Sequence, residues 1–198
     1  MGLVILGALA LYLLISIAVV VGAVKHAKKT GKSVKRWGAG AALVMYLIPF
    51  WDWLPTVAVH QYYCRTEAGF WVYKTVDQWK QENPGVMETL VANKGAPSTR
   101  QGDMTNYTDT YFLNQRFNWV IERFNAPLFN LWRHEQKVVD AKTNDVLARY
   151  VDFSTAQIRV GGGWYGWKFW LHNEHCIGGG GNQDVLRNFR NHFMGSQK

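Results

Sequence analysis

Hydrophobic and polar positions divide the chain into two parts of different character. Long apolar runs fill the first 60 residues, whereas the remainder alternates apolar and polar residues as a folded domain does. Segment 3–24 carries no charge, and at about 1.5 Å per helical residue it covers roughly the 30 Å hydrocarbon thickness of a bilayer. Segment 37–59 is apolar except for Asp52. The pattern predicts two membrane-spanning helices, at about 3–24 and 37–59, in an anchor of residues 1–59.

The first apolar segment predicts a retained helix and not a cleaved signal peptide. A signal peptide carries positive charge before an apolar core of about 7–15 residues. In this chain the run is longer, and the positive charge follows it. Small residues at positions 38–42 let the second helix approach the first closely, which indicates an antiparallel hairpin.

Segment 25–36 holds six basic residues and no acidic one, and the pattern assigns it to a loop. The six are Lys25, Lys28, Lys29, Lys32, Lys35 and Arg36. The flank after the second helix, residues 60–79, has two basic residues, Arg65 and Lys74. Because short loops rich in Lys and Arg stay in the cytoplasm, this asymmetry predicts a cytoplasmic loop and an extracytoplasmic domain at 60–198.

The net charge of +8 comes largely from this loop. Without its six residues, 16 basic residues stand against 14 acidic ones, so the rest of the chain is close to neutral. The high basicity therefore does not indicate a nucleic-acid partner. The lipid bilayer is the expected partner of the loop, since anionic headgroups attract a basic segment.

Asp52 is the one carboxylate of the apolar first part, and it stands between Trp51 and Trp53. Pro49 and Pro55 flank this group, and each favours a kink. Two interpretations compete for Asp52: a buried polar or proton-relay group in a helical bundle, or a structural group near the outer headgroups. Tryptophan prefers the membrane interface, which favours the second interpretation.

The chain has two cysteines, Cys64 and Cys176, and both belong to the predicted extracytoplasmic domain. Oxidising conditions there predict a disulfide between them, with no alternative pairing within the chain. The charge asymmetry and the cysteines come from separate parts of the chain and agree on the topology. A metal-binding or reactive thiol pair is the minority interpretation, because neither CxxC nor CxxCH is present.

Helical patterns open the domain. Segment 66–81 is expected to be a helix with an apolar stripe, and a short helix at 85–93 is expected to end at Gly95. Residues 95–110 are polar and rich in turn formers, which predicts a loop.

Strand patterns follow, with alternation of period two. They predict strands at 117–124, 131–141 and 146–154, the last two joined by a hairpin turn at 142–145, and a further strand at 164–171. Segment 182–193 then predicts a final helix, with Val185, Phe189 and Phe193 on one face and Gly195 at its end. The fold class is therefore a membrane-anchored α+β protein, with an antiparallel sheet of about four strands and flanking helices.

Candidate chemistry is sparse. His172 and His175 stand near Glu174 and Cys176, but the spacing lacks the further ligands of a zinc site, so no metal or other cofactor is expected. Ser154, Asp152 and the scattered histidines form no nucleophile elbow, and neither glycine run has the phosphate-loop pattern. The sequence therefore supports no catalytic site.

The layout resembles that of many small inner-membrane proteins of Gram-negative bacteria, with a short anchor and an aromatic, disulfide-tied domain in the periplasm. Many Trp, Tyr and Arg residues are typical of interface cores. The first functional hypothesis is a non-catalytic accessory or assembly subunit that docks on a membrane-protein partner or forms a homo-oligomer. The second is an envelope module that binds a small ligand or glycan on Trp164, Trp167 and Trp170. The third is a transport component that uses Asp52.

Overall fold

The computed structural model describes residues 2–126, 129, 131–155, 169–176 and 178–195. Contacts along the chain divide it into two compact units, Met1–Leu54 and Pro55–Lys198. This boundary lies a few residues before the one expected at 59.

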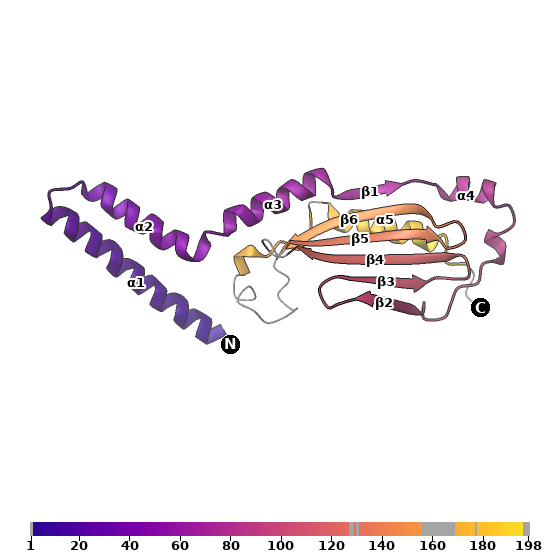
Figure 1. Cartoon of the computed structure of the whole chain (residues 1–198), viewed down its shortest axis with the longest axis horizontal. Coiled ribbons are helices and arrows are strands. Elements are labelled where there is room, and N and C mark those ends of the chain that lie inside the picture. The colour runs from indigo at the N-terminus through magenta and orange to yellow at the C-terminus, as the bar shows by residue number, and fades with distance from the viewer. Residues whose placement is uncertain (1, 127–128, 130, 156–168, 177, 196–198) are drawn as a thin grey trace. The chain divides into compact units, whose positions relative to one another are not determined.

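The first unit is a helical hairpin made of α1 (Gly2–Lys29) and α2 (Val34–Phe50), which run beside each other in Figure 1. The Tyr12 hydroxyl of α1 donates a hydrogen bond to the Met45 carbonyl oxygen of α2. A Cβ atom added to Gly38 would lie 3.1 Å from Val24 Cγ2, so a small residue at this position allows the close approach.

One described helix, Leu6–Lys29, is long and apolar enough to cross a membrane by itself. A second span exists if α2 and the following helix α3 (Trp53–Thr66) are taken together as one bent helix. The segment predicted as a helix at 37–59 is interrupted by a turn at Trp51 and Asp52, in the region where Pro49 and Pro55 favour a kink. Pro55 lies in the first turn of α3, where its missing N–H costs no helical hydrogen bond, so the helix restarts there.

The basic segment is also more helical than expected. Lys25, Lys28 and Lys29 belong to the end of α1, and Lys35 and Arg36 belong to the start of α2. The connection shrinks from the predicted 25–36 to residues 30–33, because lysine, arginine and alanine are good helix formers.

The second unit contains a six-stranded antiparallel sheet with the strand order β1-β6-β5-β4-β3-β2 (Figure 1). The strands are β1 (Gly69–Val72), β2 (Ser98–Gly102), β3 (Tyr107–Phe112), β4 (Phe117–Ala126), β5 (Leu131–Asp140) and β6 (Asp145–Thr155). The long central strands β4, β5 and β6 confirm the predictions from period-two alternation. Asn144 takes a positive φ of 62° in the turn between β5 and β6, a conformation that asparagine tolerates.

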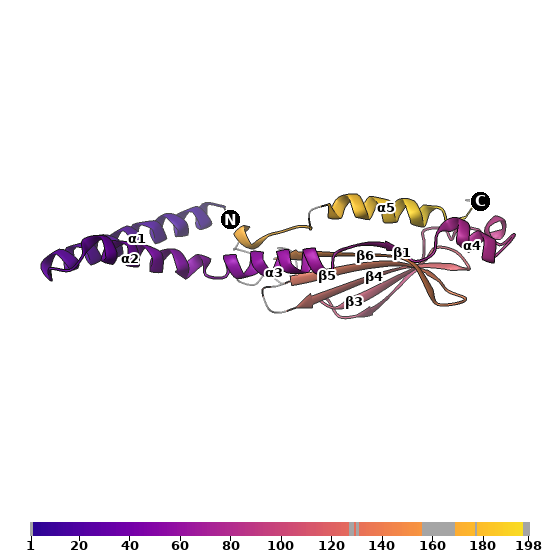
Figure 2. The same cartoon turned by 90° about the horizontal axis from the view of Figure 1, so that it is seen from above.

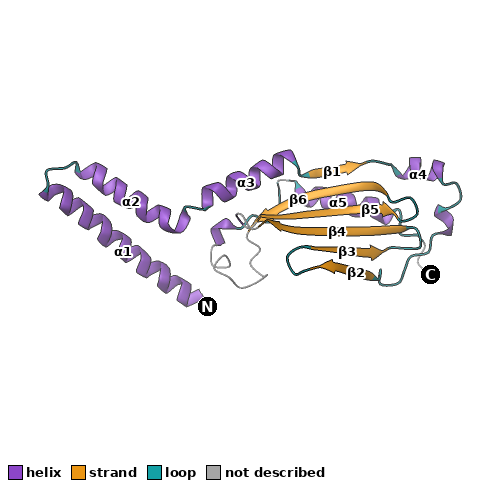
Figure 3. Cartoon of the chain, viewed as in Figure 1, coloured by secondary structure: helices purple, strands orange, loops and turns teal. Residues whose placement is uncertain are grey.

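Both edge strands at the ends of this order contradict the sequence-based prediction. Where a helix was expected at 66–81, the chain forms β1 and then the short helix α4 (Val76–Glu82). A capping box between Thr75 and Gln78 stabilises the start of α4. The expected loop at 95–110 contains β2 and most of β3 (Figure 3). The edge strands β1 and β2 are defined by pairing with their neighbours, β6 and β3, and not by their own periodicity.

The remaining helices are short except for the last. The expected helix at 85–93 is reduced to the 3-10 helix η1 (Met87–Thr89). The end of the expected strand at 164–171 is the 3-10 helix η4 (Phe169–Leu171), whereas residues 164–168 lie outside the described residues. The final helix is confirmed as α5 (Gly179–Asn191), which covers one face of the sheet (Figure 2).

Two apolar clusters hold this unit together. The larger one joins α5 and α4 to the sheet, through residues that include Leu186, Phe193, Trp79, Phe117 and Tyr150. The buried face of α5 contains Leu186, whereas the predicted Val185 is exposed. The smaller cluster joins α3 to β6 and to Cys176, with Tyr63 packed against Phe153 at 5.3 Å between ring centroids.

Candidate functional site

Asp52 lies in the turn between α2 and α3 and is 4% exposed, whereas Trp51 and Trp53 on either side of it are exposed. This arrangement leaves open both interpretations of Asp52. Its depth in a membrane and its proposed role in transport stay predictions.

The predicted aromatic binding surface is described only in part. Trp164 and Trp167 lie outside the described residues, and Trp170 is half-buried in η4. The structure therefore does not bring these three rings together as a described surface.

A cavity of about 670 Å³ opens on the sheet face that α5 partly covers. Its lining comes from β4, β5, β6, the segment 172–175 and α5. The lining residues are Trp119, Ile121, Arg123, His134, Gln136, Tyr150, Asp152, Ser154, His172, Glu174, His175 and Gln183. This volume is in the range of small-molecule binding sites.

Strand register explains why these polar groups converge. Arg123 lies opposite His134, and His134 lies opposite Asp152, so the three form one row across β4, β5 and β6. Ser154 and Tyr150 lie two positions from Asp152 along β6 and therefore share its face. Most polar side chains on a central strand are found on its solvent face, so a polar row beneath a covering helix indicates a site.

Asp152 is a buried carboxylate of the cavity wall, with a side chain 2% exposed, and it accepts four hydrogen bonds. Its Oδ2 atom accepts hydrogen bonds from the Tyr150 hydroxyl at 2.9 Å and from His175 Nδ1 at 2.6 Å. Its Oδ1 atom accepts from the backbone N–H groups of Phe153 at 2.9 Å and Cys176 at 3.0 Å. Burial, together with the charge and hydrogen bond of Asp152, raises the pKa of Tyr150, so its hydroxyl remains a donor.

His134 and Ser154 form a second buried pair, with 2.8 Å between His134 Nε2 and Ser154 Oγ. Burial lowers the pKa of His134 to about 4, the nearby Arg123 charge lowers it too, and Asp152 opposes the change. His134 is therefore neutral at pH 7. The pair has the contact of a nucleophile and its base, although Ser154 is 1% exposed and hardly reachable by a substrate.

Arg123 brings a permanent positive charge to the half-buried wall of the cavity. Its guanidinium carbon lies 5.9 Å from the ring centroid of Tyr107. Among the described residues, no carboxylate lies within ion-pairing distance of it. This cation is available to a ligand.

The two histidines singled out from the sequence have different roles. His175 binds Asp152, whereas His172 lies 3.3 Å from the exposed carboxylate of Glu174. Within the described part of the chain, they belong to no cluster of three metal-ligating atoms. Such a cluster is found elsewhere, at His60, Cys64 and Cys176.

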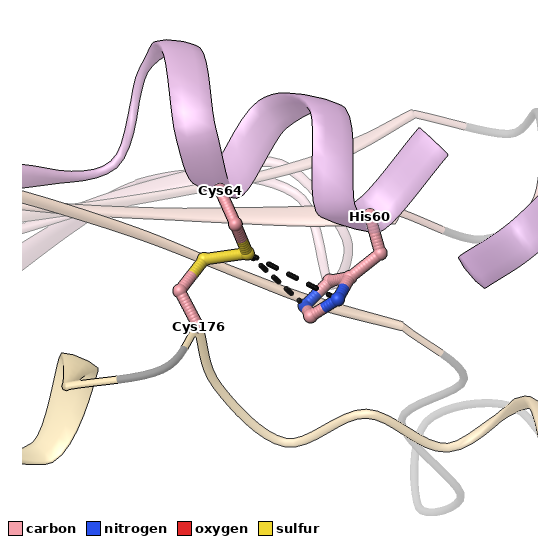
Figure 4. Close-up of side chains that lie close together, drawn as sticks. All are labelled: His60, Cys64 and Cys176. Carbon is pink, nitrogen blue, oxygen red and sulfur yellow. Dashed lines mark hydrogen bonds between the residues drawn. A yellow bond between two sulfur atoms is a disulfide. The ribbon is translucent and has the colours of Figure 1, made fainter. Parts of the chain in front are cut away.

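Cys64 and Cys176 are joined at disulfide-bonding distance, with 5.4 Å between their Cα atoms, as the sequence predicts. The bond ties α3 to the segment that supplies His175 and the Cys176 amide to Asp152. His60, one helical turn before Cys64, points its ring at the sulfur of Cys64 (Figure 4).

Sequence reasoning missed Arg123, His134 and His60 as site residues and dismissed Ser154 and Asp152. One signal was available in the sequence. Alternating positions of the two strands predicted at 131–141 and 146–154 carry His134 and Gln136, and Asp152 and Ser154. The same pattern does not predict which helix covers that face of the sheet.

Comparisons with protein-family models, with curated proteins and with solved structures find no match to this chain. Its function is therefore argued from the geometry and chemistry of the site.

Proposed function

We propose that this chain is a membrane-anchored, non-catalytic binding protein that holds a small ligand in the sheet cavity through a carboxylate or phosphate group. Arg123 carries this proposal, as a half-buried cation on the cavity wall without a carboxylate partner among the described residues. Removing a charge from water is unfavourable unless a counter-charge compensates for it. A bidentate anionic group of the ligand supplies that counter-charge to a guanidinium.

The opposite face of the sheet provides an internal comparison. There Arg133 and Arg149 both pair with Glu135, at 2.7 and 2.6 Å, and Lys137 pairs with Glu122 at 2.9 Å. Each of these three cations has a carboxylate partner within the protein. Arg123, which has no ion-pair partner among the described residues, lies on the hollowed face, and this supports binding of an anion there.

The buried groups of the cavity support binding over catalysis. Asp152 already accepts four hydrogen bonds, which leaves it little capacity to act as a base. The low exposure of Ser154 also argues against attack on a substrate. His175, half-exposed at the cavity rim, offers a further polar contact to the ligand.

The same proposal includes a location: the anchor in the bacterial inner membrane and the domain in the periplasm. The six-to-two basic asymmetry and the disulfide support it. Impermeant thiol labelling of Ser33→Cys in intact cells tests the orientation. We expect no labelling from outside until the cells are opened, and labelling of intact cells would contradict the proposed topology.

The binding test uses the full chain in detergent with its disulfide intact. A panel of small carboxylates, sugar phosphates and neutral oligosaccharides is screened by thermal shift, and hits are measured by calorimetry. We expect anionic compounds to bind and Arg123→Gln to weaken them by about 10- to 100-fold, the loss of a charge-assisted contact. The matched control is Arg187→Gln, on the exposed face of α5, which should bind normally. Equal binding by Arg123→Gln, or binding of neutral compounds alone, would contradict the proposal.

An accessory subunit is the second candidate function, and one observation favours it. The edge strand β1 and the residue after it expose Trp71, Val72 and Tyr73. Exposed aromatic residues at a strand edge suit docking of a membrane-protein partner. A stoichiometric partner that co-purifies with the wild type but not with Trp71→Ala would support this function.

A further inference from the structure

We propose that His60, Cys64 and Cys176 form a redox-gated zinc site, which is closed by the disulfide and binds Zn²⁺ after the disulfide is reduced. The proposal is independent of the ligand cavity. One ring nitrogen of His60 and the two sulfur atoms all lie within 4.8 Å of one another (Figure 4). Two thiolates and one imidazole are a frequent protein donor set for zinc.

The position of His60 is not explained by the disulfide. Its side chain is buried, at 3% exposure, and Nε2 lies 3.1 Å from the Phe153 carbonyl oxygen. Since that oxygen can only accept, Nε2 carries the proton and Nδ1 carries the lone pair. Among the described residues, Nδ1 has no nitrogen or oxygen partner; it lies 3.9 Å from Cys64 Sγ, and Nε2 lies 3.5 Å from the same atom. The nitrogen that carries the lone pair is thus buried within 4 Å of a cysteine sulfur.

The carbonyl contact matches the second shell of known zinc sites. A zinc-bound histidine commonly donates its other ring N–H to a backbone carbonyl or a carboxylate, which fixes the tautomer and orients the ring. The Phe153 carbonyl oxygen holds His60 in this way on the buried side of α3.

The distances suit coordination with small movements. Zinc bonds of about 2.3 Å to sulfur and 2.05 Å to nitrogen, at tetrahedral angles, place nitrogen and sulfur about 3.6 Å apart. Nδ1 of His60, which carries the lone pair, lies 3.9 Å from Cys64 Sγ, so a small side-chain movement reaches the coordination distance. Two zinc-bound sulfurs lie about 3.8 Å apart. With Cα atoms at 5.4 Å, rotation of the Cys64 and Cys176 side chains can open the bonded sulfurs to this separation.

The chemistry balances in two steps. A dithiol reductant exchanges with the Cys64–Cys176 bond, leaves as its own cyclic disulfide and transfers its two protons and two electrons to give two thiols. Both thiols then release a proton as Zn²⁺ binds, so the two thiolates cancel the charge of the metal. The centre is neutral, which suits its partly apolar surroundings of Leu131, Val151 and Phe153.

Three protein ligands leave a fourth position for water or an incoming ligand. In the reverse exchange, the oxidised cyclic disulfide of the dithiol accepts the two electrons as the Cys64–Cys176 bond forms again, which removes both thiolate ligands and releases the ion. The site therefore couples zinc occupancy to the redox state of its compartment.

The test uses the full chain in detergent, reduced with dithiothreitol and desalted without oxygen. We expect one Zn²⁺ per reduced chain, a thiolate-to-metal absorption band with Co²⁺, and no binding by the oxidised chain. His60→Gln should weaken zinc binding by more than about 100-fold, because losing a ligand exceeds the effect of losing a second-shell contact. The matched control His192→Gln, an exposed histidine at the end of α5, should bind as the wild type does.

Folding is followed by circular dichroism in the same samples. The oxidised His60→Gln chain keeps its disulfide and reports whether this variant folds. If reduction unfolds the wild type, zinc should restore its spectrum. No stoichiometric zinc binding by the reduced wild type, or equal binding by His60→Gln, would overturn the proposal.

Discussion

Two buried aspartates of the same sheet, Asp140 and Asp152, differ in their partners. Each is 1% exposed, and each accepts four hydrogen bonds within the described residues. Asp140 is held by Arg116 through two bonds of 2.6 and 2.8 Å, by Trp79 Nε1 at 2.9 Å and by the Lys142 amide. The principal partner of Asp140 is therefore a permanent cation.

The side-chain donors to Asp152 are instead a tyrosine, Tyr150, and a histidine, His175. Asp140 joins α4 to the sheet through Trp79, in a closed contact. Asp152 lies on the wall of a cavity. The comparison indicates that one carboxylate stabilises the fold, while the other organises a site.

The largest expected effect is that of Asp140→Asn, at about 3–5 kcal/mol of unfolding free energy, because it leaves the Arg116 charge without its partner. Burial raises the pKa of Asp140, but hydrogen bonds from Arg116 and Trp79 outweigh burial and hold the pKa below its usual value. The stabilisation is therefore present at neutral pH and is lost as the pH falls below about 4. Urea denaturation at pH 7 measures it, and an equal loss in Asp152→Asn would remove the distinction between the two carboxylates.

His134 predicts a second pH effect, on the cavity side. Its pKa is about 4 in the folded chain and about 6.5 when unfolded, so the unfolded chain binds the proton first. Stability should fall by about 3 kcal/mol as the pH is lowered from 6.5 to 4. Urea denaturation across this pH range should show a smaller dependence of the unfolding free energy on pH for His134→Gln than for the wild type. An unchanged pH dependence would show that His134 does not cause the loss of stability.

The next expected effect is energetic coupling between Asp152 and the Cys64–Cys176 disulfide. The Cys176 amide donates to Asp152, so removing the bond with Cys64→Ser/Cys176→Ser should loosen the donors of Asp152. A double-mutant cycle with Asp152→Asn should give about 1–2 kcal/mol of interaction energy, against less than about 0.5 kcal/mol with Asp140→Asn. Equal coupling in both cycles would mean that the disulfide acts on the whole domain.

The smallest expected effect is that of His175→Gln, at about 1 kcal/mol, the value of one hydrogen bond to a side chain that is half-exposed. Thermal unfolding at pH 7 measures it. A loss as large as that of Asp140→Asn would place His175 among the groups that hold the fold.

Much of the sheet was predictable, because its central strands carry their own signal. Alternation in β4, β5 and β6 and the turn at 142–145 depend on residues close together in sequence. The edge strand β1 and the strand β2 carry no comparable signal. The residues of β2 are exposed on both faces, so it has no buried side to produce alternation.

The sequence alone determined the apolar helix α1, the β5–β6 hairpin and the one possible cysteine pairing. The first two depend on residues close together in sequence, and the third follows from the presence of two cysteines. Tertiary structure decided which distant residues meet. Strand register places Arg123 beside His134 and Asp152, and the packing of α3 against β6 brings His60 to the two cysteines. These contacts join residues far apart along the chain, and only the folded arrangement of strands and helices specifies them.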